Sequence, residues 1–594
     1  MILRKNMAYE AAWSTDTLRS RRPISHDLER VFFAAAVAPD GFADGPSGQP
    51  SVKLLTTGRP PGGIVVWNTF APIPAARCHR RFRTNSPWPP VTRPYAFTTL
   101  IPREGVPMTK SDSTHSSNDS APHSLRAGSL GVMGIAFFVI ASIGPMSAVV
   151  GGVSLAFANG PGAAVPVLFV ITGILLLFFA VGFVAMSQHV VSAGGFYEYI
   201  GAAFGVRAKR AAGYLALLSY YGVVLALWAL VSVTVARFVV EFGGPDVSWV
   251  YYMLGGQLIV AFLGSRDVNV SARVLGFLTI AEILIILVLN AAVITQGGAE
   301  GLSMAPFDPS LALDGNIGAG LLFCIAVFLG FEGTAIYSEE AKDPKRTIPI
   351  ATYLCVGLIS VFYIVTTWVL VMAFGVDNVQ SAAQSDPSNM VFAVGADYLG
   401  NSFVDAMKVL FVTSTFAACL GLHNAVSRYQ FSLAREHMLP KALSRTHPEW
   451  KSPTRSSLIQ SAIGIGVTLV AWLTKQDPIS ILFSLLLAIG TLGIIVIWVF
   501  TSAAIVKFFR TEKRGHSRFK TLIAPTLSGL GLAWIVVLLL KNWDLQTGMP
   551  DSWASYLPLV IAAVLAVGFL LPTSTRPRNV APESKATRTK ENLQ

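Results

Sequence analysis

From about residue 130 onward, the chain alternates between long apolar runs and short polar segments. A run of roughly 18 or more apolar residues is long enough to cross the hydrocarbon core of a bilayer as a helix. Twelve such runs are present, and each predicts a membrane-spanning helix: 130–157, 162–186, 213–240, 247–264, 272–295, 317–338, 349–374, 402–425, 455–474, 479–508, 520–540 and 554–572. We therefore expect an all-α integral membrane protein with 12 transmembrane helices.

The charges between these runs test the count, because Lys and Arg accumulate in short cytoplasmic loops. If the segment before residue 130 is placed inside, the even-numbered loops become cytoplasmic and are basic, whereas the opposite loops hold almost no basic residue except Lys475 and Lys541. A missed helix would invert this pattern beyond the error. The sequence thus predicts a multi-pass protein of the cell membrane with both termini cytoplasmic.

Composition agrees with a membrane protein and gives no sign of other partners. Hydrophobic residues make up 53% of the 594 positions and charged residues only 13%, about half the charged share of a soluble protein. The net charge of +12 is explained by the basic loops and an Arg-rich N-terminal region, so we expect a lipid bilayer and no nucleic acid as partner. The four cysteines are widely spaced, which suggests neither a disulfide framework nor a metal site, and we expect no cofactor.

The first hundred residues differ from the rest of the chain. Residues 1–107 hold 14 of the 34 prolines and 12 arginines against 2 lysines, without lasting periodicity. We expect a disordered or non-native extension here, with Met108 as the true start; a genuine disordered cytoplasmic extension is the alternative. The remaining divisions are a polar cytoplasmic tail at 108–127, a transporter domain at 128–573 and a disordered cytoplasmic tail at 574–594.

Two predicted helices carry a helix-breaking sequence. The first contains Ile143–Pro145, and proline removes a backbone donor and clashes with the preceding turn. The sixth contains Gly330–Gly333, where each glycine weakens the helix by roughly 1 kcal/mol and Glu332 costs roughly 2.5 to 3.5 kcal/mol at bilayer depth. Interrupted segments in positions one and six fit two inverted five-helix repeats with a binding site where the breaks meet. A packed kink is the alternative for the first break alone.

The first break offers groups that bind an anion. Pro145 suits the first position of a new half-helix, so the amides of Met146, Ser147 and Ala148 are expected to point into a cavity and bind a carboxylate. Ser142 and Ser147 add hydroxyl groups.

The second break offers groups that bind a cation. Backbone carbonyls between Phe328 and Phe331, together with the carboxylate of Glu332, can accept hydrogen bonds from an ammonium group. One anionic and one cationic end suit an amino acid.

Three stretches carry a resemblance to a known family. These are GFEGTAIYSEEAKDPKRTIP from Gly330 onward, SAGGFYEYIGAAFG at 192–205 and RYQFSLAREHMLP at 428–440. From about 125 to 575 the chain resembles the amino acid, polyamine and organocation (APC) transporter superfamily. The resemblance implies a LeuT-like 5+5 inverted repeat with broken helices 1 and 6, and alternating-access transport of amino acids or related amines.

The resemblance also implies a set of substrate-binding residues. They are Ser142, Gly144, Met146 and Ser147 in the first helix and Phe328, Phe331 and Glu332 in the sixth. Ile143 and Gly330, which lie in the two breaks, complete the expected substrate-binding set. Many relatives have a Gly-Ser-Gly type of turn where this chain has Ser142–Pro145. Some proton-coupled relatives have a lysine in the fifth helix where this chain has Glu282.

Coupling to an ion has two candidate groups. Glu282 and Glu332 are carboxylates deep within predicted helices, and either could hold a proton or a cation; a neutral, hydrogen-bonded residue between helices is the alternative for Glu282. Thr413 and Ser414, with Thr415, could bind sodium or simply bond back to the preceding helical turn. We expect proton coupling first and sodium coupling or exchange second.

Several other polar side chains lie within or beside the predicted helices. Tyr220 and Tyr221 either reach the pocket or pack, and His189 and His423 are expected to be ordinary residues at helix ends. A membrane-embedded enzyme would need converging metal ligands or a nucleophile, and a channel would need repeated filter motifs. Neither pattern is present, so we expect a permease with no enzymatic activity and no catalytic residues.

Overall fold

The structure, a computed structural model, describes residues 125–571 except 267, 314, 512–514 and 550–551, and omits the side chains of 268–272. All described residues belong to one compact unit, Ser111–Gln594. The predicted extension at 1–107, most of the polar tail at 108–127 and the tail at 574–594 lie outside the described residues.

The described part of the chain is helical, and its only β-type pairing is one parallel bridge between Leu130 and Ala341. Within the described residues, eleven helical segments are long and apolar enough to cross a membrane, and the 17-residue α7 (Trp249–Ser265) supplies the twelfth predicted span. The spans are, in chain order, α1–α3 with η1 (Val132–Ile143, Pro145–Ser147, Ala148–Val153, Ser154–Asn159), η2–α4 (Gly162–Ala164, Val165–Ser187), α6 (Val206–Glu241), α7 (Trp249–Ser265), α8 (Val268–Gln296), α10 with η4 (Ile317–Ala326, Phe331–Ala335), α11 (Pro344–Phe374), α14 (Asn401–Arg435), α15 (Thr454–Leu473), η6–α16 (Pro478–Leu485, Leu486–Thr511), η7–α17 (Phe519–Ile523, Ala524–Lys541) and η8–α19 (Trp553–Tyr556, Pro558–Leu570). The predicted number of spanning helices is confirmed.

Short helices lie between the spans. They are α5 (Phe196–Phe204), η3 (Ala305–Phe307), α9 (Pro309–Leu313), α12 (Val379–Ser385), α13 (Met390–Leu399), η5 (Lys441–Ser444) and α18 (Trp543–Thr547).

Two spans extend further than the apolar runs predicted. The helix predicted to end at residue 425 continues to Arg435. Hydropathy missed its last turns because they carry polar side chains such as Arg428 and Gln430, which are buried in the structure. The third span begins at Val206 instead of 213, and its first two turns hold basic residues that lower hydropathy without breaking a helix.

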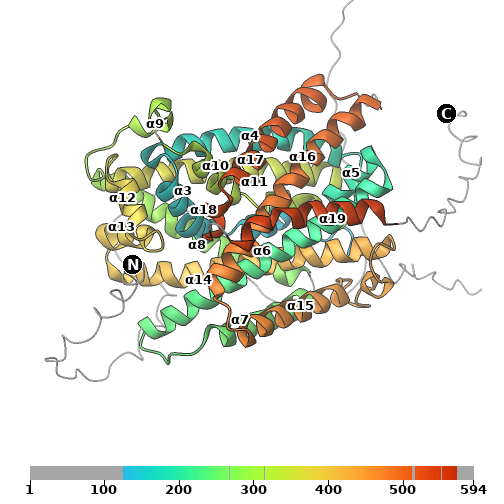
Figure 1. The fold of residues 1–594 in the computed structure, drawn as a ribbon, viewed down its shortest axis with the longest axis horizontal. Helices are drawn as coiled ribbons and strands as arrows, with labels where there is room; N and C mark the ends of the chain where they lie inside the picture. Colours follow the sequence, from blue (N-terminus) through green and yellow to red (C-terminus); the bar gives the residue numbers. More distant parts are fainter. Residues whose placement is uncertain (1–124, 267, 314, 512–514, 550–551, 572–594) are drawn as a thin grey trace, which may run out of the picture. The chain divides into compact units, whose positions relative to one another are not determined.

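The packing of the long helices brings the broken spans to the centre of the bundle. Long helices lie side by side in Figure 1, with α6 packed against α14, α16 and α19, and α4 packed against α11 and α17. The first half of the broken first span, α1, packs against α8, α11, α14 and η4. Helix 1 therefore meets the fifth, seventh and eighth spans and the second break.

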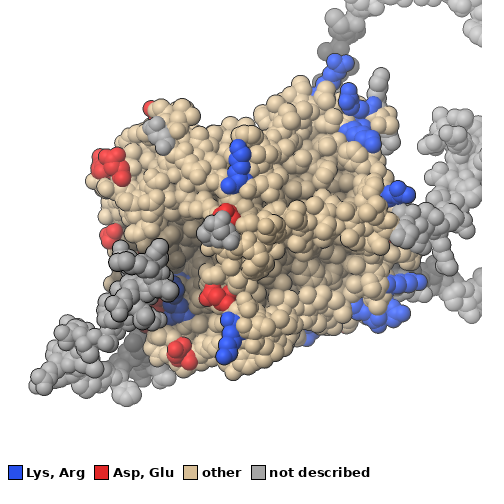
Figure 2. Space-filling model, viewed as in Figure 1, with Lys and Arg blue, Asp and Glu red and all other residues tan. Residues whose placement is uncertain are grey.

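Charge is distributed unevenly on the visible face. In Figure 2, most Lys and Arg side chains gather toward one end of the long helices and most Asp and Glu toward the opposite end. The surface between these ends is largely uncharged, as expected for helices whose middle portions contact lipid.

Candidate functional site

The first spanning helix is interrupted at Gly144. Its backbone, with φ 62° and ψ 71°, is in the left-handed region that glycine adopts without a Cβ penalty. Its N–H closes α1 by donating to Ala141 O at 3.1 Å, and Pro145 then starts the second half-helix at the position where proline costs no hydrogen bond. A Cβ at residue 144 would lie 3.3 Å from Ala418 Cβ, so α14 packs directly on the break.

The sixth spanning helix unwinds after Ala326, where α10 ends. Gly330, with φ 112° and ψ −20°, precedes the short helix η4, and its N–H donates to Glu332 Oε2 at 2.9 Å. The other carboxylate oxygen, Glu332 Oε1, accepts from Tyr220 Oη at 2.6 Å. The acid thus satisfies a backbone donor of the interrupted helix and is fixed from the third span, since both oxygens have partners.

The two breaks touch. A Cβ at Gly330 would lie 3.3 Å from the backbone carbon and oxygen of Ser142, the residue two positions before Gly144. On its other side, Ser142 fits against α14 only because residue 421 is glycine, where a Cβ would lie 2.3 Å from Ser142 Oγ. The two breaks are therefore in contact, as the sequence predicted, and Ser142 packs between Gly330 and Gly421.

The amides predicted to be free at the first break have partners within the protein. Met146 N donates to Glu282 Oε2 at 3.3 Å, and Ser147 N donates to Ser414 Oγ at 3.2 Å. The expectation of free amides is wrong in this structure, because α8 and α14 pack against the half-helix and bring a carboxylate and a hydroxyl to it. This juxtaposition joins the expected coupling residues Glu282 and Ser414 to the expected binding residues.

Glu282 is fully buried in α8. Its second oxygen, Oε1, has no hydrogen-bond partner among the described residues. A buried carboxylate oxygen without a donor is costly, so the site holds unused capacity to accept a hydrogen bond.

Aromatic rings surround the second break. The ring of Phe331 lies 5.9 Å from Phe179 of α4 and 5.0 Å from Trp498 of α16, both edge to face. The ring of Phe328 lies 5.3 Å from Tyr363 of α11. These expected pocket residues therefore lie in an aromatic wall, and aromatic faces attract organic cations.

Not every hydroxyl of the eighth span reaches the break. Thr413 Oγ1 donates to Leu410 O and Thr415 Oγ1 to Phe411 O, each at 3.0 Å. Successive helical residues point about 100° apart, so only Ser414 of the three faces the first span. For Thr413, the alternative of bonding back to its own helix describes this structure.

Two aromatic and polar side chains were not assigned correctly from the sequence. Tyr429 of α14 packs its ring 5.4 Å from that of Tyr220, beside Glu332. It lies in the family-like stretch 428–440, but the stretch did not single it out as a site residue. His423, expected at a helix end, is buried within α14, and its Nε2 lies 2.8 Å from Ser457 Oγ of α15. Both depend on which face of α14 its neighbours cover, which periodicity alone does not fix.

Charged side chains form pairs near the ends of the sixth and eighth spans. Arg428 of α14 binds Glu340 through Nε–Oε2 at 2.5 Å and Nη2–Oε1 at 2.9 Å, and Arg435 Nη1 binds Glu339 Oε2 at 2.9 Å. Among the described residues, no group of three or more His, Cys, Asp or Glu side chains could hold a metal ion.

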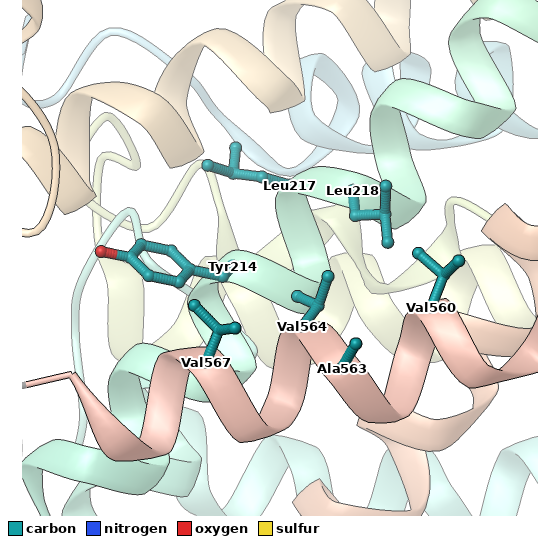
Figure 3. A pocket seen from close by; sticks show the side chains of 7 residues that line it. All are labelled: Tyr214, Leu217, Leu218, Val560, Ala563, Val564 and Val567. Atoms are coloured by element: carbon teal, nitrogen blue, oxygen red, sulfur yellow. The ribbon is translucent and has the colours of Figure 1, made fainter.

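A surface groove lies apart from both breaks. It runs between α6 and α19 and is lined by Tyr214, Leu217, Leu218, Val560, Ala563, Val564 and Val567 (Figure 3). Its walls are almost wholly apolar and none of the candidate site residues lines it. The groove offers no charged group, and the hydroxyl of its one polar side chain, Tyr214, donates to Met438 O, so we place the candidate site at the breaks.

Comparison with known proteins places this architecture in a family. The family model described as amino acid permease matches residues 130–577, which include every spanning helix. The chain belongs to the amino acid permease family. As an APC superfamily permease, it is a membrane protein of the transporter class.

Individual relatives are distant. The low-affinity putrescine importer PlaP of Escherichia coli K12 is 23% identical over 62% of this chain and 80% of its own length. The probable amino-acid permease meu22 of Schizosaccharomyces pombe is 24% identical over 70% of this chain and 76% of its own length. The human cystine/glutamate transporter is 24% identical over 49% of this chain and 57% of its own length. This chain is thus similar to carriers that are named for quite different substrates.

Proposed function

We propose that this permease is a secondary active transporter that moves small amines or amino acids across the cell membrane by alternating access. The observation that carries the proposal is the contact between the two breaks, where Gly330 lies against Ser142 and Glu332 is held in the same place. Interrupted helices that meet at mid-membrane can bind a ligand and change conformation around it. Similarity to a putrescine importer and to amino acid permeases supports the same substrate range.

We propose protons as the driving ion. Two buried carboxylates, Glu282 and Glu332, lie at the breaks, and carboxylates inside membranes commonly relay protons. Sodium is the second choice, because Ser414 Oγ already accepts from Ser147 N and Thr413 turns back to its own helix. Exchange of one amine for another is compatible with the same site.

We propose that both termini face the cytoplasm. The alternating basic loops and the gathering of Lys and Arg at one end in Figure 2 support this orientation. Transport, with no chemical change of the substrate, is the activity proposed.

Uptake into proteoliposomes tests the proposal. The full chain would be assayed with labelled amines and amino acids under proton gradients, under sodium gradients and with neither. We expect saturable, proton-dependent uptake and counterflow. An enzyme would alter the substrate chemically, and a channel would pass current without counterflow.

Carboxylate variants test the coupling groups. Glu332→Gln and Glu282→Gln each remove a charge at the breaks, and we expect at least one to uncouple uptake from the proton gradient. Glu241→Gln is a matched control, because Glu241 lies at the exposed end of α6, where Lys408 pairs with it. Unchanged coupling in both site variants contradicts the assigned roles.

A further inference from the structure

The start of the second half-helix already holds a carboxylate that belongs to the protein. Pro145 has no N–H, and the first amide after it, Met146 N, donates to Glu282 Oε2 at 3.3 Å. A helix N-terminus attracts an anion through its unpaired amides and its dipole. Here Glu282, from a helix 136 positions further along the chain, is that anion.

The following amides are also occupied. Ser147 N donates to Ser414 Oγ at 3.2 Å, and Ala148 N donates to Gly144 O at 2.8 Å. The first four residues of this half-helix thus offer no free N–H in the described structure. A substrate carboxylate could bind here only by displacing a group that the fold provides.

Charge opposes such a displacement. An incoming carboxylate would lie beside Glu282 and close to the break that holds Glu332, and like charges in a poorly solvated site repel strongly. None of the hydrogen bonds that the structure describes for 144–148 or 330–332 comes from a lysine or arginine. The hydrogen-bonding partners of these residues therefore include no basic side chain that would balance a substrate carboxylate.

We propose that the substrate is an organic cation, an amine without an α-carboxylate, and that Glu282 takes the place that the carboxylate of an amino acid would fill. The inference rests on the proposed transport function and names the substrate class of the same site. An ammonium group donates three hydrogen bonds, and the buried Glu282 Oε1 has no donor of its own. Phe331, next to Glu332 in the second break, packs edge to face with Trp498, and an aromatic ring near the site favours a cation.

Matched pairs of substrates test the inference on the wild-type protein. Putrescine and ornithine, cadaverine and lysine, and phenethylamine and phenylalanine differ within each pair by the α-carboxylate alone. We expect the full chain in proteoliposomes to prefer the amine in at least one pair by about tenfold or more in the ratio of maximal uptake to half-saturating concentration.

A substitution at Glu282 tests whether this residue sets the preference for amines. Glu282→Ala frees Met146 N and removes the competing charge, so we expect the preference for amine over amino acid to fall by about tenfold or more. Asn290→Ala is the control: it lies two turns further along α8, where its Nδ2 donates to Thr366 Oγ1 at 2.9 Å, and we expect it to keep the wild-type preference.

The outcomes separate this inference from the proposed function. Equal or better uptake of the amino acid in every pair by the wild-type protein overturns the inference and leaves amine and amino acid transport standing. Uptake of neither member of any pair overturns both. If Glu282→Ala does not fold, the wild-type comparison still decides.

Discussion

Arg428 and Glu340 form a buried two-point ion pair that joins the eighth span to the segment after the sixth, with only 2% of each side chain exposed. Removing one partner leaves a buried charge without compensation, which typically costs about 3 to 5 kcal/mol. We expect Glu340→Gln to lower the thermal unfolding temperature of the purified protein sharply. The double variant Arg428→Met with Glu340→Leu should recover most of the loss, because it buries no charge. A double variant as unstable as the single one would show that the pair matters through packing instead.

Tyr220→Phe should weaken transport because Glu332 loses a hydrogen-bond donor. The variant removes the hydroxyl that donates to Glu332 Oε1, and a hydrogen bond to a charged group contributes about 1.5 to 3 kcal/mol. We expect the substrate concentration at half-maximal uptake to rise about tenfold or more. Tyr221→Phe is the matched control, since the neighbouring hydroxyl contacts Gln430 and not the break. Equal effects of the two variants would contradict the role of Tyr220.

Gly330→Ala should disrupt the contact between the breaks. The positive φ of 112° strains any residue with a Cβ, and that atom would lie 3.3 Å from the Ser142 backbone. Strain of this kind costs about 1 to 3 kcal/mol, and we expect both stability and uptake to fall. Gly357→Ala in α11 is the control, because a Cβ there meets nothing within 4 Å and alanine favours a helix. Normal uptake by Gly330→Ala would show that the turns need not touch.

Glu436 should make stability depend on pH. Lys209 Nζ lies 2.6 Å from Glu436 and 2.7 Å from Glu198. Burial and the adjacent Glu198 raise the pKa of Glu436 from 4.5 to about 7. The pKa of Glu198 is lowered: burial acts to raise it, but hydrogen bonds with Glu436 and Lys209 outweigh that effect.

The direction of the pH dependence of stability follows from proton binding by Glu436 in the folded state. A raised pKa of Glu436 stabilises the fold fully below about pH 4.5, and this contribution is lost as the pH rises through about 7. The lowered pKa of Glu198 acts below pH 4.5, outside that window. We expect the unfolding temperature to fall between about pH 5 and about pH 8 and Glu436→Gln to flatten this slope. An equal slope in both proteins would refute the assignment.

The breaks themselves could be predicted from sequence because their chemistry is local. Pro145 removes a backbone donor and so kinks or breaks a helix interior, and Gly330 so close to Glu332 is implausible in a helix that faces lipid. The spans followed from apolar length. The true end of α14 did not, because its last turns are polar and only the surrounding helices show that side chains such as Arg428 are buried.

The partners of the breaks could not be predicted in the same way. The hydrogen bond between Met146 and Glu282 joins residues 136 positions apart, and it depends on the rotation of α8 against the first span. The sequence marked Glu282 as a deep carboxylate and Met146 as a carboxylate-binding residue. Only the packing shows that each is the other's partner.

The backbone bridge at Leu130 has a consequence for motion. Leu130 N donates to Glu340 O at 2.9 Å, and Lys342 N donates to Leu130 O at 2.8 Å. These two backbone hydrogen bonds connect the residue that leads into helix 1 to the segment that follows helix 6. When the protein opens on that side, either the two segments move together as one rigid body, or both hydrogen bonds break and re-form in every transport cycle.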